Sequence, residues 1–190
     1  MLEKLPPAIG RALRRIRPGM NRIAANREDL GGSNEALVLE SSAFAKDTTI
    51  PVRFTADGEG VSPPLRWSQL PEGTVSLALL VEDADSPTPV PLVHALVANL
   101  TRVGELAEGA IRADGERDTG LVIGKNSFFD QGWLPPDPPR GHGPHRYAFQ
   151  LFALDKTLPL AARFGRNALL AAMRGHILAR GVMVAMYSRD

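Results

Sequence analysis

Residues 76–100 read SLALLVEDADSPTPVPLVHALVANL, two apolar runs separated by a polar, proline-rich loop. Each run has the length and the bounding turn residues of a strand, so we predict strands over 76–82 and 92–100. Consecutive strands that a short loop connects usually lie side by side in a sheet. These residues therefore predict the antiparallel centre of a β-sheet.

Other short runs of apolar or alternating residues, bounded by Gly, Pro, Asp and Ser, occupy 37–39, 49–54, 147–154 and 182–187. Many short strands with little helix between them favour a β-sandwich, so the predicted fold is all-β with peripheral helices. Residues 166–180 differ, because Leu170, Met173 and Ile177 recur there at helical spacing. They predict a helix that Gly181 ends.

Composition limits the classes of function. The chain has 190 residues, enough for one domain with a modest extension. It has no cysteine, which excludes a thiol nucleophile, a disulfide framework and cysteine-ligated metal sites. A formal net charge of +1 gives no global electrostatic argument for a nucleic-acid partner. No apolar run is long enough for a membrane span or a secretory signal, so we expect a soluble, cytoplasmic protein.

The first 34 residues are more basic than the rest, with seven basic and three acidic side chains. An apolar stripe at helical spacing consists of Ile9, Leu13, Ile16, Met20 and Ile23. Pro18 and Gly19 interrupt the stripe, so we predict short helices over 8–17 and 19–27 and a linker at 31–34. Such a segment docks on its own domain, on a partner subunit in a homodimer, or on an anionic membrane surface. The predicted division is a basic amphipathic extension with its linker, 1–34, and a sandwich domain, 35–190.

The candidate binding site is centred on His94, which lies inside an apolar strand. Asp83 and Asp85 end the preceding strand and His145 begins a later one, so antiparallel pairing brings these groups together. A carboxylate beside an imidazole favours the charged imidazolium, and Asn126 and backbone N–H groups add hydrogen-bond donors. We therefore predict a pocket for an oxyanion or a zwitterion. The alternative is that the two aspartates only terminate their strand as turn residues.

Residues 132–145 contain five of the sixteen prolines of the chain. Because each proline fixes its φ angle, this segment is predicted to be a rigid loop that loses little entropy on ordering. Its first part includes Trp133, Pro136, Pro138 and Pro139. We expect this part to fix the ligand geometry, with its N–H groups held in place before the ligand arrives.

Several kinds of chemistry lack their usual motifs. His142 and His145 with Asp83 could imitate a zinc site, but their spacing is not that of a helix face and no HExxH motif supports it. Phosphate-binding glycine loops and the nucleophile elbow of hydrolases are absent as well, so we predict no metal and no cofactor. A hydrolase that uses His94, His145 and Asp83 as acid and base stays an alternative, as does a pure protein-interaction module.

Six stretches in the same order resemble the phosphatidylethanolamine-binding protein family, and most closely its bacterial branch of Raf-kinase-inhibitor-like proteins. They are residues 54–67, 81–87, 93–94, 126–128, 141–147 and 175–189, and the resemblance spans residues 36–189. It implies a Greek-key β-sandwich with a small anion pocket at one end. It also implies binding of phosphate-bearing head groups and modulation of a kinase or a protease.

The resemblance implies that the pocket is formed by a defined set of residues: Asp83, Asp85, Pro87, His94, the loop 132–139, His145 and Tyr147. Leu92 and Ala95 depart from the family pattern, which has aromatic residues around the strand histidine. This departure predicts a less aromatic wall and argues against recognition of an ammonium group by cation–π contacts. The leading expectation is a regulatory protein without turnover that binds a small phosphate- or carboxylate-bearing ligand.

Overall fold

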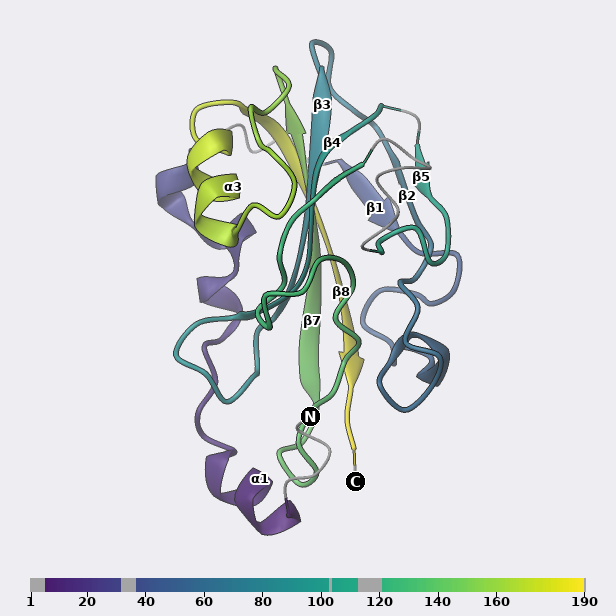
Figure 1. Ribbon diagram of the computed structural model, residues 1–190, viewed down its shortest axis with the longest axis vertical. Helices are drawn as coiled ribbons and strands as arrows, with labels where there is room; N and C mark the ends of the chain where they lie inside the picture. Colours follow the sequence, from purple (N-terminus) through teal and green to yellow (C-terminus); the bar gives the residue numbers. More distant parts are fainter. Residues whose placement is uncertain (1–5, 32–36, 103, 113–120, 190) are drawn as a thin grey trace.

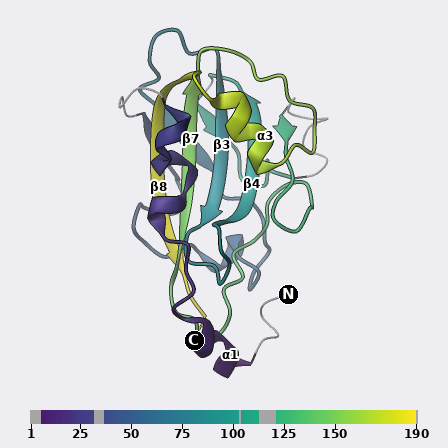
Figure 2. The same ribbon diagram turned by 90° about the vertical axis from the view of Figure 1, so that its left-hand side faces the viewer.

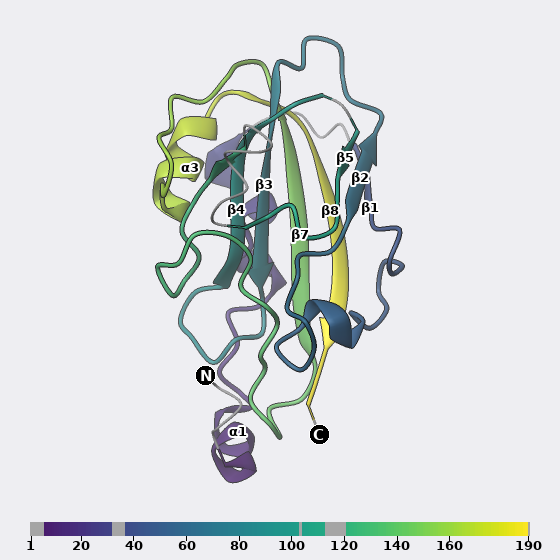
Figure 3. The ribbon, with the colours of Figure 1, turned by 45° about the vertical axis from the view of Figure 1, so that its right-hand side comes forward.

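The computed structural model describes residues 6–31, 37–102, 104–112 and 121–189, and within them the chain forms two antiparallel sheets (Figure 1). The large sheet has the order β6 (Val122–Ile123), β4 (Leu92–Leu100), β3 (Ser76–Asp83), β7 (His145–Leu154) and β8 (Ile177–Tyr187). The small sheet has the order β1 (Val38–Glu40), β2 (Leu65–Ser68) and β5 (Glu105–Leu106). The small sheet packs over one face of the large sheet (Figure 3), which confirms the predicted sandwich.

The central strands β3 and β7 are buried on both faces of the large sheet, which explains why residues 76–83 read as a continuous apolar run. Leu77, Leu79 and Val81 point into the core between the two sheets. Ala78 and Leu80 point into a second core on the opposite face. The large sheet therefore needs a cover on its outer face, away from the small sheet.

Two elements supply this cover (Figure 2): the helix α3 (Arg166–Met173) and residues 20–30 of the N-terminal segment, which we define as residues 6–31. This segment contains α1 (Pro7–Leu13) and three 3₁₀ turns, Met20–Arg22, Ala24–Asn26 and Glu28–Leu30. Ile23 and Leu30 are fully buried against the sheet. The N-terminal segment thus docks on its own domain, the first of the three predicted alternatives.

Two buried polar side chains of the sheet receive hydrogen bonds from the N-terminal segment. The N–H of Ala24 donates to Glu82 Oε2 at 2.8 Å, and the N–H of Ala25 donates to Gln150 Oε1 at 2.6 Å. Glu82 also forms an ion pair with Arg166, at 2.6 Å from Arg166 Nε. Because a buried carboxylate needs partners, the sheet and the N-terminal segment depend on each other.

The predicted helices in this segment were only partly correct. The α-helix ends at Leu13, and 3₁₀ turns replace the second helix, which is interrupted where Ile23 and Arg27 adopt extended conformations. The predicted apolar stripe splits: Ile23 is buried, whereas Ile9 and Ile16 are 42% and 47% exposed. Most of the predicted linker at 31–34, and the predicted domain boundary after residue 34, lie outside the described residues.

Two other predictions about secondary structure were wrong. Residues 49–54 do not form a strand, because only Thr49 makes a bridge to Met186 and a 3₁₀ turn follows at Val52–Phe54. The helix predicted over 166–180 ends at Met173, and residues from Ile177 onward pair with β7 along its whole length. Among the residues that the structure describes, no helix is long and apolar enough to cross a membrane.

Candidate functional site

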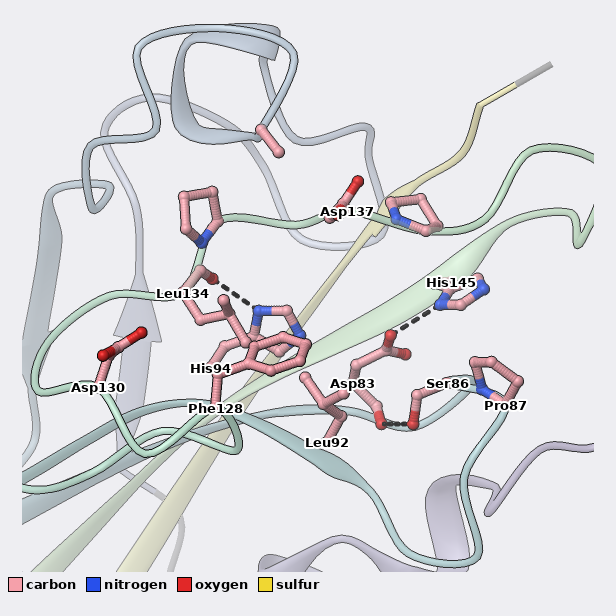
Figure 4. A pocket seen from close by; sticks show the side chains of 13 residues that line it. Asp83, Ser86, Pro87, Leu92, His94, Phe128, Asp130, Leu134, Asp137 and His145 are labelled. Carbon is pink, nitrogen blue, oxygen red and sulfur yellow. Dashed lines mark hydrogen bonds and ion pairs between the residues drawn. The ribbon is translucent and has the colours of Figure 1, made fainter. Parts of the chain in front are cut away.

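A cavity of about 390 Å³ opens at the end of the large sheet where β3 ends and β7 begins (Figure 4). Its walls come from these strands, from β4, and from the loops 84–91 and 124–139. The lining residues are Ala56, Asp83, Ser86, Pro87, Leu92, His94, Phe128, Asp130, Leu134, Pro135, Asp137, Pro138 and His145. The sequence thus correctly predicted that Asp83, Pro87, His94, Pro138 and His145 lie together.

Asp83 and His145 form a buried pair in the wall. Asp83 lies opposite Tyr147 in the β3–β7 ladder, so the start of β7 carries His145 alongside its carboxylate. His145 Nδ1 lies 2.7 Å from Asp83 Oδ2. The other carboxylate oxygen, Oδ1, accepts the N–H of Asp85 at 2.8 Å. The geometry gives Asp83 a partner for each oxygen and fixes the plane of the His145 ring.

A hydrogen-bonded chain continues from His145 to the N-terminal segment. His145 Nε2 lies 2.7 Å from His142 Nδ1, and His142 Nε2 lies 3.0 Å from the Leu13 carbonyl oxygen. A carbonyl oxygen only accepts, so His142 Nε2 carries the hydrogen. Burial, helped by the nearby charge of His145, lowers the pKa of His142, and a neutral ring leaves Nδ1 as an acceptor. His142 Nδ1 therefore accepts from His145 Nε2, and His145 Nδ1 lies against the Asp83 carboxylate.

His94 has a different state. Its Nδ1 lies 2.7 Å from the Leu134 carbonyl oxygen, so this nitrogen carries the hydrogen. Burial lowers the pKa of His94, although the charge of Asp83 acts in the opposite direction. The neutral ring then has a lone pair on Nε2, and this buried atom has no hydrogen-bond partner. His94 is thus held as one tautomer by a backbone contact from the proline-rich loop.

Two of the predicted ligand residues shape the walls from outside the cavity. The Asp85 carboxylate accepts hydrogen bonds from Nε and Nη2 of Arg146, both at 2.7 Å. Burial alone would raise the pKa of Asp85, but the hydrogen bonds from Arg146 hold it below its usual value. Asn126 Oδ1 accepts the N–H groups of Phe128 and Asp130 and so folds their turn. Both residues position neighbours that line the cavity.

The aromatic residues predicted for the site support His94 from behind. Trp133 donates its Nε1 hydrogen to the Phe54 carbonyl oxygen at 3.1 Å, and its ring lies 6.1 Å from that of His94. Tyr147 is fully buried and meets the His94 ring edge-on at 5.1 Å. Neither is among the lining residues, so their contribution is to the orientation of the His94 ring.

The proline-rich loop is held in place as expected, but two of the prolines that we assigned to the cavity do not line it. Pro136 and Pro139 are not among the lining residues, whereas Pro135 and Pro138 are. The prolines have no N–H, and the Leu134 N–H donates to the His94 carbonyl oxygen. The Trp133 and Leu134 N–H groups are held in place by the Ile111 and His94 carbonyl oxygens, and the expectation that the loop fixes the ligand geometry stays a prediction. Arg189 binds Asp137 of this loop and fixes it to the end of β8.

Sequence reasoning did not single out several lining residues. Leu134, Pro135 and Asp137 lie inside the predicted loop, but their backbone or side-chain roles depend on the fold. Phe128 adds one aromatic ring to the wall, and the expectation, drawn from Leu92, of a wall less aromatic than that of the family stays a prediction. The available signal in the sequence was the pair Phe128 and Phe129 inside a polar turn. In the structure both are exposed, by 40% and 73%.

Metal binding finds no support in the geometry. Within the described ranges, no group of three or more His, Asp and Glu side chains could hold a metal ion. His142, which we considered as a ligand, is occupied by His145 and by the Leu13 carbonyl group. The expectation of no metal and no cofactor stays a prediction for the chain as a whole.

An antiparallel β-sandwich whose strand ends carry a pocket with two histidines and an aspartate is thus the class of protein defined by the fold and the site. The chain belongs to the phosphatidylethanolamine-binding protein family, whose sequence profile matches residues 40–188. The N-terminal segment lies outside this match. Membership of the bacterial Raf-kinase-inhibitor-like branch stays a prediction, as do the homodimer, the kinase or protease partner and the cytoplasmic location.

Similar proteins cover most of the chain. It is 38% identical over 161 residues to a UPF0098 protein of Pyrococcus abyssi, which is 84% of this chain and 90% of that protein. A solved structure from Chlamydia trachomatis, described as a phosphatidylethanolamine-binding protein homologue, is 37% identical with a TM-score of 0.74 and covers 83% of this chain and 100% of its own. Escherichia coli YbcL, described as a new member of the mammalian family, is 28% identical with a TM-score of 0.77 and covers 82% and 100%.

Proposed function

We propose that the protein binds a small ligand, with a phosphate or carboxylate group of that ligand held between His94 and His145. The observation that carries this proposal is the convergence of His94 and the Asp83–His145 pair on one cavity. Burying titratable groups is unfavourable unless they are paired, and such groups are concentrated at functional sites. A cavity of about 390 Å³ has the size of a pocket for a small molecule.

The outer part of the cavity suits a second, cationic group of the same ligand. Phe128 offers a half-exposed ring, and the exposed carboxylate of Asp130 lies on the same wall (Figure 4). An aromatic face and a carboxylate together attract an ammonium group. A compact zwitterion, with its oxyanion inside and its amine at the rim, fits this arrangement. Phosphoethanolamine is the simplest probe of this class.

We also propose that the ligand is bound without turnover. Ser86 is the hydroxyl group of the cavity wall, and its Oγ lies 2.6 Å from Thr88 Oγ1 rather than against a histidine. An activated nucleophile needs a base within hydrogen-bond distance. Modulation of a kinase or a protease rests on the family resemblance alone and is kept as a proposal, together with the cytoplasmic location.

Calorimetric titration with phosphate and phosphoethanolamine tests the pocket. We expect both to bind the wild-type protein, with phosphoethanolamine binding more tightly, and His145→Ala to lose most of the heat. Asp130→Asn should remove the advantage of phosphoethanolamine while leaving phosphate binding unchanged. Equal heats for wild type and His145→Ala would refute the assignment of the site. Release of phosphate from phosphoethanolamine on long incubation would refute binding without turnover.

A further inference from the structure

The groups that line the cavity are mostly hydrogen-bond acceptors. Thr88 Oγ1 donates to the Val90 carbonyl oxygen at 2.7 Å, so the hydrogen between Ser86 and Thr88 comes from Ser86. The Ser86 oxygen is therefore left with lone pairs only. Asp83 contributes a carboxylate, which also only accepts.

Several donors of the same walls are already engaged. Both ring nitrogens of His145 face protein groups, Asp83 on one side and His142 on the other. The Leu134 N–H donates to the His94 carbonyl oxygen, and Pro135 and Pro138 have no N–H. An oxyanion without a hydrogen would thus find no free donor on the His145 ring or on the Leu134–Pro138 part of the wall for which these contacts are given.

One atom of the cavity, His94 Nε2, requires a hydrogen-bond donor from the ligand. The side chain is 3% exposed, lines the cavity, and is pinned as the Nδ1–H tautomer by Leu134. The titratable groups near it are Asp83 on β3 and His145 and Tyr147 on β7, and Asp130 and Asp137 line the same cavity. Asp83 favours a second proton on His94, but burial and the charge of His145 oppose it, and the pKa of His94 is lowered. Nε2 therefore accepts, and a bound molecule must supply the hydrogen.

We propose that the pocket selects oxyanions that carry their own acidic hydrogen, namely phosphomonoesters or free phosphate as the monoanion, over phosphodiesters. The P–OH group of the monoanion donates to His94 Nε2, which no atom of a diester phosphate can do. This inference rests on the proposed binding of an oxyanion and narrows it to one chemical class. The phosphate of an intact membrane phospholipid is a diester, so soluble phosphomonoesters are the favoured ligands.

Methyl phosphate and dimethyl phosphate form a matched pair for the test. At about pH 5 both carry one negative charge, and only methyl phosphate has a P–OH group. We expect calorimetry to show methyl phosphate binding about tenfold more tightly or better, since a buried acceptor left without a donor is unfavourable by roughly that factor. Above the second pKa of methyl phosphate, about 6, its affinity should fall by up to about tenfold per pH unit. Equal affinities for the two esters at about pH 5 would overturn the inference.

Two variants separate His94 from general effects. His94→Gln places an amide that can donate, so the preference for the monoester should disappear. His176→Gln removes an imidazole that is paired with Asp155, outside the cavity, and should preserve it. Thermal melting controls for folding, and nitrogen NMR of the wild-type ring gives a measurement that needs no variant.

The NMR measurement has its own decisive outcome. The Nδ1–H tautomer of His94 at neutral pH supports the inference, whereas an Nε2–H tautomer or an imidazolium overturns it. If neither ester binds and phosphate does not bind either, the proposed function itself is overturned. Binding of both esters with equal affinity leaves the proposed function intact and overturns only the selection for an acidic hydrogen.

Discussion

The substitution Ile23→Ala tests whether the N-terminal segment is part of the folded domain. Ile23 is fully buried in the core between the outer face of the large sheet and its cover. Truncation of a buried isoleucine to alanine lowers the free energy of unfolding by about 3 kcal/mol, through lost burial and the cavity left behind. For a chain of this length that corresponds to a melting temperature lower by roughly 6–12 °C.

Ile16→Ala is the matched control, because Ile16 lies on the same segment and is 47% exposed. We expect its effect on the free energy of unfolding to stay within about 0.5 kcal/mol. Urea titration of both variants measures the difference. If Ile23 and Ile16 have equal effects, the segment does not dock as described and the reasoning is refuted.

A second readout covers local release of the segment. If the N-terminal segment detaches before the domain unfolds, the loss of global stability cannot exceed the free energy of docking. Ile23→Ala then shifts the urea midpoint by less, but trypsin cleaves after Arg22 and Arg27 faster than in Ile16→Ala. An unchanged urea midpoint together with unchanged cleavage would leave no docked state for Ile23 to stabilise.

Three further outcomes are expected. Gly10→Ala should destabilise the docking of α1 by about 1–3 kcal/mol, because a Cβ would lie 2.0 Å from the Arg140 carbonyl oxygen. Gly165→Ala meets no atom within 4 Å and, as the loss of an N-cap glycine only, should lower stability by less than about 1 kcal/mol in the same urea titration. Arg166→Met should lower stability by about 3 kcal/mol because it leaves buried Glu82 without its cation, and Arg66→Met, which breaks an exposed pair, should change it by less than about 1 kcal/mol. The pKa values of His94 and His142 are lower in the folded chain than in the unfolded chain, so the unfolded chain binds more protons as the pH falls. The contribution of these two histidines to stability is therefore complete above about pH 6.5 and is lost as the pH falls toward their folded pKa values. A melting temperature that does not change between neutral and mildly acidic pH would contradict this.

The sequence predicted those parts of the fold and of the site that follow from strand pairing. The runs in β3 and β4 are apolar because both faces are buried, and their ends bring Asp83 and His94 together. Ile177 could not be assigned correctly, because its spacing fits a helix while pairing with β7 outweighs that local preference.

The misassigned site residues have a related cause. Asp85 has the chemistry of a ligand residue, but Arg146 on the neighbouring strand takes its carboxylate, and only the folded chain shows that choice. Likewise, the N-terminal segment contributes the Leu13 carbonyl oxygen to the histidine chain, a backbone role that no side-chain pattern signals.

The proline-rich wall affects how ligand binding can be observed. Of the six residues 134–139, only Leu134 and Asp137 possess an amide proton, so amide-detected NMR and hydrogen exchange are almost blind to this side of the cavity. The Leu134 amide becomes the local reporter, because it is bonded to the backbone of His94 and exchanges only when that contact opens. Aromatic and imidazole resonances, those of Phe128 and His94, will carry the remaining signal of an occupied pocket.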